Sequence, residues 1–254
     1  MQFVFDLEGT ICFEDQPVPD SITYSLECLV QKGHEVIFSS SRPIRDMLPL
    51  LAKRFHGNKM IGRNGAILCH NGNVKPNVVF DEETLESIRL LMKEYKVTYF
   101  IEGEWDYSYT GPADHPIAET IDPNGLGVNK PLDKLEHVVK ITIVTSFNMA
   151  ILRKKLDELN VIIHTHYQLG MLDITPCGIQ KWKALKKLGI EKGAYITFGD
   201  DEYDIPVFEH AKHSVMVGDH PLLALYADEC ISKNQLIEEQ IVEKLEELDQ
   251  RFAY

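Results

Sequence analysis

The chain has 254 residues, of which 44% are hydrophobic and 26% are charged, which is enough apolar material for one large core or two smaller ones. Its formal net charge of −13 argues against a protein that binds nucleic acid or a membrane surface, because those partners attract basic surfaces. A small phosphorylated substrate is still compatible with this charge, since a bound metal or a local cation reverses the sign inside a pocket.

The first third of the chain alternates between short apolar strands and helices. The predicted strands are residues 3–5, 34–42 and 59–68, and the predicted helices are residues 19–33 and 43–55. Pro19 near the start and Gly33 at the end are typical of helix boundaries, whereas Pro49 predicts a kink in the second helix. This alternation predicts a parallel sheet with helices on its faces, in which ligands bind at the carboxyl ends of the strands.

The pattern changes near residue 80 and resumes after residue 174. Between them, the predicted helices are residues 81–95 and 147–160, and the predicted strand regions are residues 97–111, 137–146 and 161–176. After them, helices are predicted at 178–190 and 234–252, a strand at 213–219, and a strand, loop and helix within 195–211. We therefore predict an α/β protein with a doubly wound, Rossmann-like core of residues 1–79 and 175–254. Residues 80–174 are predicted to form an inserted α+β domain.

The cysteines and the N-terminal residues bear on the cellular compartment of the protein. The five cysteines are scattered and form no CxxC pair: Cys12, Cys28, Cys69, Cys177 and Cys230. A disulfide framework or a structural zinc site is therefore not expected, and reduced thiols in the cytoplasm are the simpler interpretation. We see neither a signal peptide nor a membrane-spanning segment in the sequence.

Four small groups of residues with reactive side chains fall at predicted strand ends or loop starts. They are Asp6 with Glu8, Ser40, Lys181, and Asp200 with Asp204. Each alone has an ordinary interpretation, such as an acidic turn, a helix cap or a solvated lysine. Together they indicate chemistry, because carboxylates can hold one Mg²⁺ while a hydroxyl and an ammonium donate to phosphate oxygens. An aspartate can attack phosphorus, and a second acid can protonate the leaving alkoxide and then deprotonate water.

The same residues lie in ordered motifs. DLEGT at 6–10 is similar to a DxDGT pattern, and SSSR at 39–42 is similar to a hydroxyl motif that is usually Thr-Gly-Arg. GIQKW at 178–182 supplies a lysine, GDDEYD at 199–204 is similar to GDxxND, and RNGA at 63–66 is similar to an Asn-Gly-Ala segment. In these motifs, over nearly its whole length, the chain resembles the haloacid dehalogenase (HAD) superfamily of phosphohydrolases, specifically its Cof-like branch.

The resemblance implies a role for each catalytic residue. Asp6 is implied as the nucleophile that forms an aspartyl-phosphate, and Glu8 as the acid/base. Ser40 and Lys181 are implied to bind the transferring phosphoryl group, with Lys181 also steadying Asp6.

The resemblance also implies a Mg²⁺ site and a substrate-binding set. The implied metal residues are Asp6, Glu8 through its backbone carbonyl, Asp200, and Asp204, which supports the site through hydrogen bonds or water. The implied substrate-binding residues are Gly9, Ser41, Arg42 and Asn64.

Two residues depart from the family pattern. Glu8 stands where the motif usually has a second Asp, and its longer side chain must fold back to reach the same leaving group. The enolase-phosphatase branch of the superfamily also carries Asp-x-Glu-Gly-Thr, so glutamate is compatible with hydrolysis. Tyr203 stands where GDxxND has Asn, so we expect the loss of a hydrogen bond and weaker metal binding.

The inserted domain is implied to be a cap that selects the substrate. Only about ten residues separate Gly9 from the first predicted helix, so the insertion corresponds to the family's second cap position. Candidate specificity residues are Trp105, Tyr107, Tyr109, His164 and His166. The alternative is that these side chains pack on the cap's own sheet, and strand alternation favours that for about half of them.

These features predict a Mg²⁺-dependent cytoplasmic phosphatase that hydrolyses small phosphate monoesters, such as sugar phosphates or nucleotides. The alternatives are a phosphomutase, a catalytically decayed binding or regulatory module, and a receiver-type signalling domain, which the large insertion disfavours. The expected partner is a small phosphorylated metabolite, with no nucleic acid and no membrane. The chain is expected to be a monomer or a weak homo-oligomer.

Overall fold

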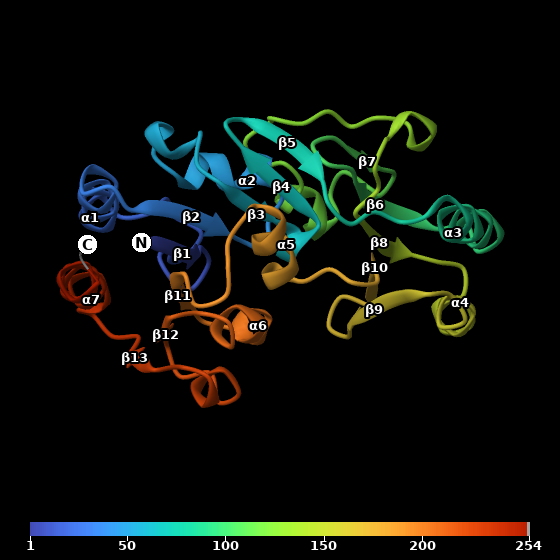
Figure 1. Ribbon diagram of the computed structural model, residues 1–254. Helices are drawn as coiled ribbons and strands as arrows, with labels where there is room; N and C mark the ends of the chain where they lie inside the picture. The colour runs from blue at the N-terminus through green and yellow to red at the C-terminus, as the bar shows by residue number, and fades with distance from the viewer. Residues whose placement is uncertain (253–254) are drawn as a thin grey trace. The chain divides into compact units, whose positions relative to one another are not determined.

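The structure is a computed structural model that describes residues 1–252, and the chain forms two compact units (Figure 1). The first unit, called here the core unit, contains residues 1–73 and the chain from residue 180 onward. The second, called the inserted unit, contains residues 74–179. The boundaries expected from the sequence, residues 80 and 174, lie a few residues inside the inserted unit. At the C-terminal end, the reason is that strand β10 (Met171–Pro176) continues past residue 174.

The core unit is built on seven strands of an eight-stranded sheet with the strand order β13-β12-β11-β1-β2-β3-β4-β5, and the eighth strand, β5, spans the boundary between the units at residue 73. The strands are β1 (Gln2–Asp6), β2 (Glu35–Ser39), β3 (Met60–Gly62), β4 (Ile67–His70), β5 (Asn73–Pro76), β11 (Tyr195–Gly199), β12 (His213–Val217) and β13 (Glu229–Ile231). The six strands from β13 to β3 are parallel, and β4 pairs antiparallel with β3. The strand order reverses at β1, which defines a doubly wound sheet and places the switch point at the end of this strand.

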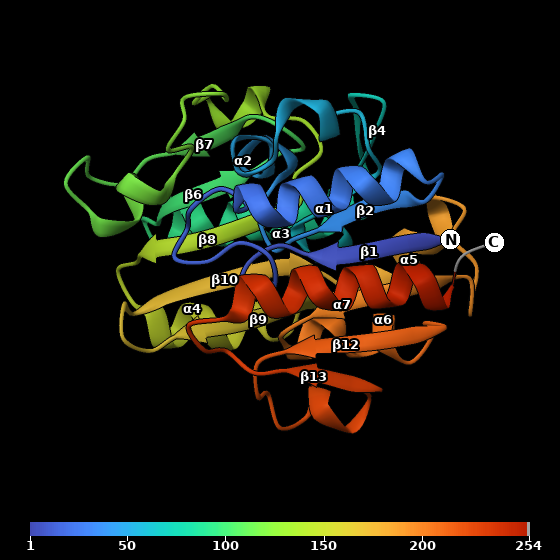
Figure 2. The same ribbon diagram turned by 90° about the vertical axis from the view of Figure 1, so that its left-hand side faces the viewer.

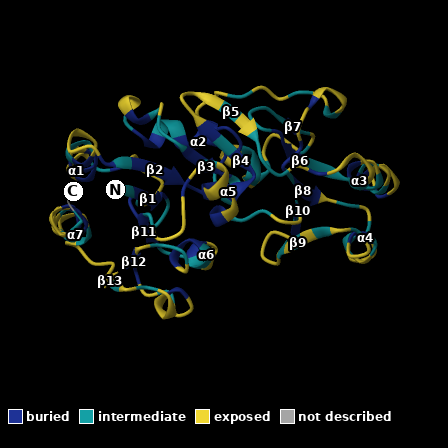
Figure 3. Ribbon diagram, in the orientation of Figure 1, coloured by how far each residue is buried: buried dark blue, intermediate teal, exposed yellow. Residues whose placement is uncertain are grey.

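Helices cover both faces of this sheet. They are α1 (Asp20–Gln31), α2 (Ile44–Met47), α5 (Lys181–Lys187), α6 (Ile205–Phe208) and α7 (Ile237–Arg251). Figure 2 shows α1 and α7 side by side across one face of the sheet, and these two helices are in contact. On the other face, Trp182 and Leu185 of α5 pack with Val4 and Ile37 of the sheet. The central strands are therefore buried on both faces, as the dark strands of Figure 3 show, which explains their nearly continuous apolar sequence.

Two predicted elements of the core unit are shorter than the sequence suggested. Residues 43–55 were expected to form one kinked helix, but α2 ends at Met47 and only two 3₁₀ turns follow it. Pro49 explains this, because it removes a backbone donor and clashes with the preceding turn. Residues 59–68 were expected to form one strand region, but Arg63 and Asn64 adopt positive φ and turn the chain between β3 and β4.

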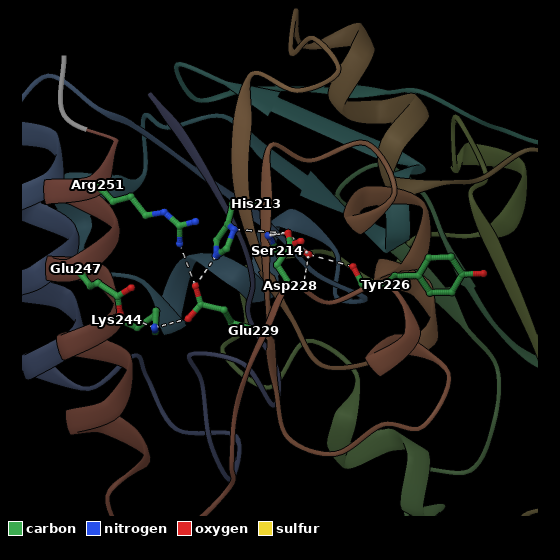
Figure 4. Close-up of polar contacts among 8 residues, drawn as sticks. All are labelled: His213, Ser214, Tyr226, Asp228, Glu229, Lys244, Glu247 and Arg251. Atoms are coloured by element: carbon green, nitrogen blue, oxygen red, sulfur yellow. Dashed lines mark hydrogen bonds and ion pairs between the residues drawn. The ribbon is translucent and has the colours of Figure 1, made fainter.

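The C-terminal helix is packed on the core unit, as expected. Ile241, Leu245 and Leu248 of α7 are buried. Polar contacts also tie this helix to the sheet edge, as Figure 4 shows. Glu229 of β13 accepts a hydrogen bond from the buried His213 of β12 at 2.8 Å, and it also pairs with Lys244 and Arg251 of α7. Next to it, Ser214 of β12 and Asp228 are hydrogen-bonded to each other.

The inserted unit has a five-stranded antiparallel sheet with the order β7-β6-β8-β10-β9. Its elements are α3 (Glu82–Glu94), β6 (Thr98–Glu102), β7 (Tyr107–Tyr109), β8 (Lys140–Thr145), α4 (Met149–Leu156), β9 (Val161–His166) and β10 (Met171–Pro176). Ile88 of α3 and Leu152 of α4 share one hydrophobic core with Ile141, Ile143 and Leu172 of the sheet. Both helices begin at side-chain caps, Asp81 for α3 and Asn148 for α4. Among the described residues, no helix of either unit is long and apolar enough to cross a membrane.

Candidate active site

The reactive residues of the core unit meet at the carboxyl ends of three neighbouring strands. Asp6 ends β1, Ser40 follows β2, and Asp200 follows β11. A cleft of about 190 Å³ opens at this place. Its lining residues are Asp6, Glu8, Gly9, Ser41, Lys181, Asp200 and Asp201. The edge of a parallel sheet therefore brings together residues that are up to 195 positions apart in the sequence.

A buried lysine joins two of the aspartates. The ammonium of Lys181 donates to Asp6 Oδ1 at 2.5 Å and to Asp204 Oδ1 at 2.8 Å, and all three side chains are at most 5% exposed. Burial alone lowers the pKa of Lys181, but the two carboxylates outweigh it and the pKa is raised well above its usual range. Lys181 therefore stays charged at neutral pH and compensates part of the acidic cluster.

The carboxylates of Asp6, Asp200 and Asp204 form a cluster that fits a divalent cation. One oxygen from each lies within 4.8 Å of the other two. Burial raises the pKa of Asp6 well above its usual range, and Asp204 and Glu8 raise it further, while Lys181 opposes them. Burial also raises the pKa of Asp200. Three oxygen donors with mutual repulsion are the ligand type that Mg²⁺ prefers, so the residues present fit this ion.

Two glycines of the motifs allow the backbone to approach these carboxylates. Gly9 has a φ of +74°, and a Cβ there would lie 2.0 Å from Asp200 Oδ2. A Cβ on Gly199 would lie 2.4 Å from Asp204 Oδ2. Both positions therefore require glycine, the first because of its φ as well as its crowding.

Glu8 is held by two partners from the loop after β2. Ser40 Oγ donates to its carboxylate oxygens at 2.8 and 3.0 Å, and Arg42 Nε lies 2.6 Å from Oε1. Arg42 is itself paired with Asp15. The backbone N–H of Arg42 donates to Ser40 Oγ at 2.8 Å, which fixes the fully buried hydroxyl. The longer side chain of Glu8 thus folds back onto Ser40 and Arg42.

The remaining predicted substrate-binding residues shape the same loop. Ser41 is exposed and lines the cleft, and its carbonyl accepts a hydrogen bond from Arg63 at 2.9 Å. Asn64 lies in the left-handed region, and its backbone N–H donates to the Ser40 carbonyl at 3.0 Å. These contacts place Asn64 beside the loop after β2 through its backbone.

The acidic loop after β11 closes without an asparagine at position 203. Asp201 caps the short 3₁₀ turn by accepting from the N–H of Tyr203 at 2.8 Å, and Asp204 completes a capping box. Asp204 Oδ2 also accepts from the N–H of Asp200 at 3.1 Å. Because Asp201 and the backbone supply these bonds, the side chain of residue 203 is not needed for them, and Tyr203 is 43% exposed.

Three further residues at this site were not predicted from the sequence, although Thr10 lies within the DLEGT motif. Lys233 Nζ lies 3.0 Å from Asp200 Oδ2, and Thr10 Oγ1 lies 3.5 Å from Asp200 Oδ1. Asp15 anchors Arg42 from an exposed loop. Both Lys233 and Asp15 lie in loops without a recognisable motif, and only the folded chain brings them to the site.

The candidate specificity residues take part in the structure of the inserted unit itself. Trp105 Nε1 donates to the Leu126 carbonyl at 2.9 Å, and Tyr109 donates to the Pro112 carbonyl at 2.7 Å. The rings of Tyr107 and Phe100 lie edge to face. Two further candidates lie on β9: His164 is exposed, and His166 bonds to Asp173 at 2.9 Å. For Trp105, Tyr107 and Tyr109, the structure thus shows local packing of the kind that strand alternation had suggested for half of the set.

Comparison with known proteins identifies the family. The sequence profile of the haloacid dehalogenase-like hydrolases matches residues 3–239, so this chain belongs to that family. A protein of Mycoplasma genitalium that is named as a phosphatase is 25% identical over 240 residues, covering 84% of this chain and 85% of the relative. The 5-amino-6-(5-phospho-D-ribitylamino)uracil phosphatase of Bacillus subtilis is 21% identical over 228 residues, covering 84% of each.

Solved structures of the same fold cover nearly the whole chain. A structure from Eubacterium rectale has a TM-score of 0.80 at 15% identity, covering 97% of this chain and 98% of that one. A sugar phosphatase of HAD subclass IIB has a TM-score of 0.69 at 21% identity, covering 97% and 98%. The predictions of a Cof-like member of the HAD superfamily and of a doubly wound core with an inserted α+β unit are confirmed.

Proposed function

We propose that this protein is a Mg²⁺-dependent phosphatase that hydrolyses small phosphate monoesters through an aspartyl-phosphate on Asp6. Membership of a hydrolase family and the two phosphatase-named relatives support a phosphoric monoester hydrolase. The observation that carries the mechanism is the contact of the buried Lys181 with Asp6 beside an acidic cluster and a cleft. This arrangement supplies a nucleophile, a cation and a place for a phosphate in one volume.

In the first step, an oxygen of Asp6 attacks phosphorus and the bond from phosphorus to the ester oxygen breaks. Lys181 keeps its charge, so it orients Asp6 and neutralises negative charge as the phosphoryl group arrives. Glu8 donates a proton to the leaving alkoxide, which then departs as the alcohol. The hydroxyl of Ser40 donates to a phosphate oxygen in place of Glu8.

In the second step, Glu8 returns as a base. Its carboxylate removes a proton from a water molecule, and the water oxygen attacks phosphorus. The bond from phosphorus to the Asp6 oxygen breaks, which releases inorganic phosphate and restores both carboxyl groups. Arg42 holds Glu8 between these steps, so that the same group serves the leaving alcohol and the water.

Asp6, Asp200 and Asp204 would hold the Mg²⁺, with the backbone carbonyl of Glu8 completing the protein ligands. When bound, the ion supplies positive charge for the ionised Asp6 and for a phosphate oxygen. Burial and repulsion from Asp204 and Glu8 raise the pKa of Asp6, so the positive charge of the ion would favour the ionised, nucleophilic form.

The substrate class and the cellular setting follow from the same proposal. The cleft of about 190 Å³ suits the phosphate end of a small metabolite, such as a sugar phosphate or a nucleotide. The inserted unit is proposed to act as the cap that selects the rest of the substrate. The five cysteines are all free thiols, which supports a reducing compartment such as the cytoplasm. We propose a monomer or a weak homo-oligomer.

Hydrolysis of p-nitrophenyl phosphate by the full chain tests the mechanism. Activity should require Mg²⁺ and disappear in Asp6→Asn, whereas Asp133→Asn should leave it unchanged, because Asp133 is largely exposed in the inserted unit. Activity that persists in Asp6→Asn would contradict the aspartyl-phosphate. Inactivity on a broad panel of phosphate esters, together with no Mg²⁺ binding, would favour the decayed module. Formation of an isomeric phosphate ester, rather than inorganic phosphate, would favour a phosphomutase.

A further inference from the structure

Lys233 is a cation at the acidic cluster that the catalytic steps do not use. It lies in the loop between β13 and α7, and its Nζ donates to Asp200 Oδ2 at 3.0 Å. Asp200 is one of the three carboxylates that fit a divalent ion. Lys181 contacts the other two, Asp6 and Asp204. Each carboxylate of the cluster is thus paired with one of two lysines.

Two glycines leave the space that the side chain of Lys233 occupies. A Cβ on Gly9 would lie 3.1 Å from Lys233 Nζ, and a Cβ on Gly218 would lie 3.3 Å from Lys233 Cε. Both glycines have positive φ, +74° and +114°. The side chain of Lys233 therefore passes Gly218 and ends against Gly9, with its ammonium directed at Asp200.

The two lysines differ in how easily they can leave the cluster. Lys181 is 2% exposed and has two carboxylate partners, so its ammonium is fixed within the cluster. The side chain of Lys233 is 46% exposed and has Asp200 as its acidic partner. A long, half-exposed lysine can move its head into water at little cost.

We propose that Lys233 is a positioning residue of the metal site, which occupies Asp200 in the metal-free protein and leaves it when Mg²⁺ binds. This inference rests on the proposed function, because it assumes that the cluster binds Mg²⁺. Lys233 holds the Asp200 carboxylate and reduces repulsion within the cluster. It also competes with the ion, so it sets the Mg²⁺ affinity below the value that the three carboxylates alone would give.

The size of this competition can be estimated from the charges. After it leaves Asp200, an ammonium that is still about 5 Å from a divalent ion in a water-like dielectric repels that ion enough to change an affinity roughly ten-fold. The half-exposed position of Lys233 justifies the water-like value. We therefore expect Lys233→Met to bind Mg²⁺ roughly ten-fold more tightly than the wild type.

Calorimetric titration of the metal-free full chain with MgCl₂ at pH 7.5 tests this expectation directly. Lys233→Gln also removes the charge but keeps a polar side chain, so it provides the same test if Lys233→Met folds poorly. Lys233→Arg keeps the charge and should bind Mg²⁺ like the wild type. Lys192→Met is the matched control, because Lys192 is an exposed lysine of the core unit, and its loss should leave the affinity unchanged.

The outcomes separate this inference from the proposed function. Tighter Mg²⁺ binding in both charge-removing variants, but not in Lys233→Arg or Lys192→Met, supports the competition. Equal or weaker binding in Lys233→Met and Lys233→Gln, with normal binding by the wild type, overturns the role of Lys233 and leaves the metal site intact. No Mg²⁺ binding by the wild type overturns the metal site itself, and the inference falls with it.

Discussion

Replacing Lys181 by methionine should destabilise the metal-free protein strongly. The substitution leaves Asp6 and Asp204 buried without their cation, although the side-chain volume is nearly kept. Each ion pair corresponds to roughly 6 kcal/mol of attraction at an effective dielectric constant of about 20, although desolvation offsets much of it. Removal of one partner from a buried pair typically costs about 3–5 kcal/mol. We expect a loss of this size in the free energy of unfolding, or a fall in melting temperature of roughly 10 °C.

Thermal unfolding, followed by circular dichroism in EDTA at pH 7.5, measures this loss. Lys183→Met is the matched control, because Lys183 lies in the same helix, α5, but is exposed. Two conditions should reduce the difference between Lys181→Met and the wild type. Mg²⁺ should do so by supplying positive charge to the same carboxylates. A pH near 5 should do so as well, because a carboxyl whose folded pKa is raised takes up a proton in the folded state first, which relieves the unpaired charge.

The reasoning would be refuted by a melting temperature of Lys181→Met equal to that of Lys183→Met in EDTA. That result would mean that Lys181 does not carry the charge of the buried cluster. A large loss that neither Mg²⁺ nor mild acid reduces would also contradict it, because the cost would then come from packing and not from unpaired carboxylates.

Three further predictions address the acid/base, the motif glycine and the inserted unit. Glu8→Gln should lower kcat roughly 10²- to 10⁴-fold for an alkyl phosphate, whose leaving group needs a proton, as steady-state kinetics can measure. Gly9→Ala should abolish Mg²⁺ binding in a titration, because its Cβ would lie 2.0 Å from Asp200 Oδ2 at a positive φ. Burial raises the pKa of Asp173, but Lys140, Thr142 and His166 outweigh it and hold that pKa at about 2. Asp173→Asn should therefore lose about 2 kcal/mol of stability at pH 7, and urea unfolding should show that the difference from the wild type shrinks between pH 4 and pH 2.

The sequence predicts which residues lie together at the candidate site because they belong to short motifs at strand ends. Asp6, Ser40 and Asp200 each follow an apolar strand directly, so the doubly wound sheet brings them together wherever the connecting segments run. Lys233 has no such marker, since it contacts Asp200 only because the loop before α7 returns past Gly218. A contact of this kind depends on tertiary structure and leaves no pattern in nearby residues.

Two other features of the structure have a recognisable cause in the sequence. Pro49 predicted a disturbance of the helix over residues 43–55, and the structure shows that it ends the α-helical segment. The pair of acids in GDDEYD, Asp201 and Asp204, has the spacing of a capping box, in which the first acid caps the turn and the third residue after it bonds back. The expected loss of an Asn hydrogen bond at Tyr203 leaves these loop contacts in place, because Asp201, Asp204 and the backbone make them.

The glutamate at position 8 joins the acid/base to the phosphate site through one hydroxyl. Its extra methylene group allows the carboxylate to reach Ser40 Oγ, which is fully buried and which the N–H of Arg42 already holds in place. A hydroxyl has one proton to donate, so it cannot serve both Glu8 and a phosphate oxygen. In the proposed mechanism, Ser40 turns to the phosphoryl group when it arrives, and Glu8 is left with Arg42 as its partner. This exchange would free the carboxyl group of Glu8 from Ser40 so that it can face the leaving group.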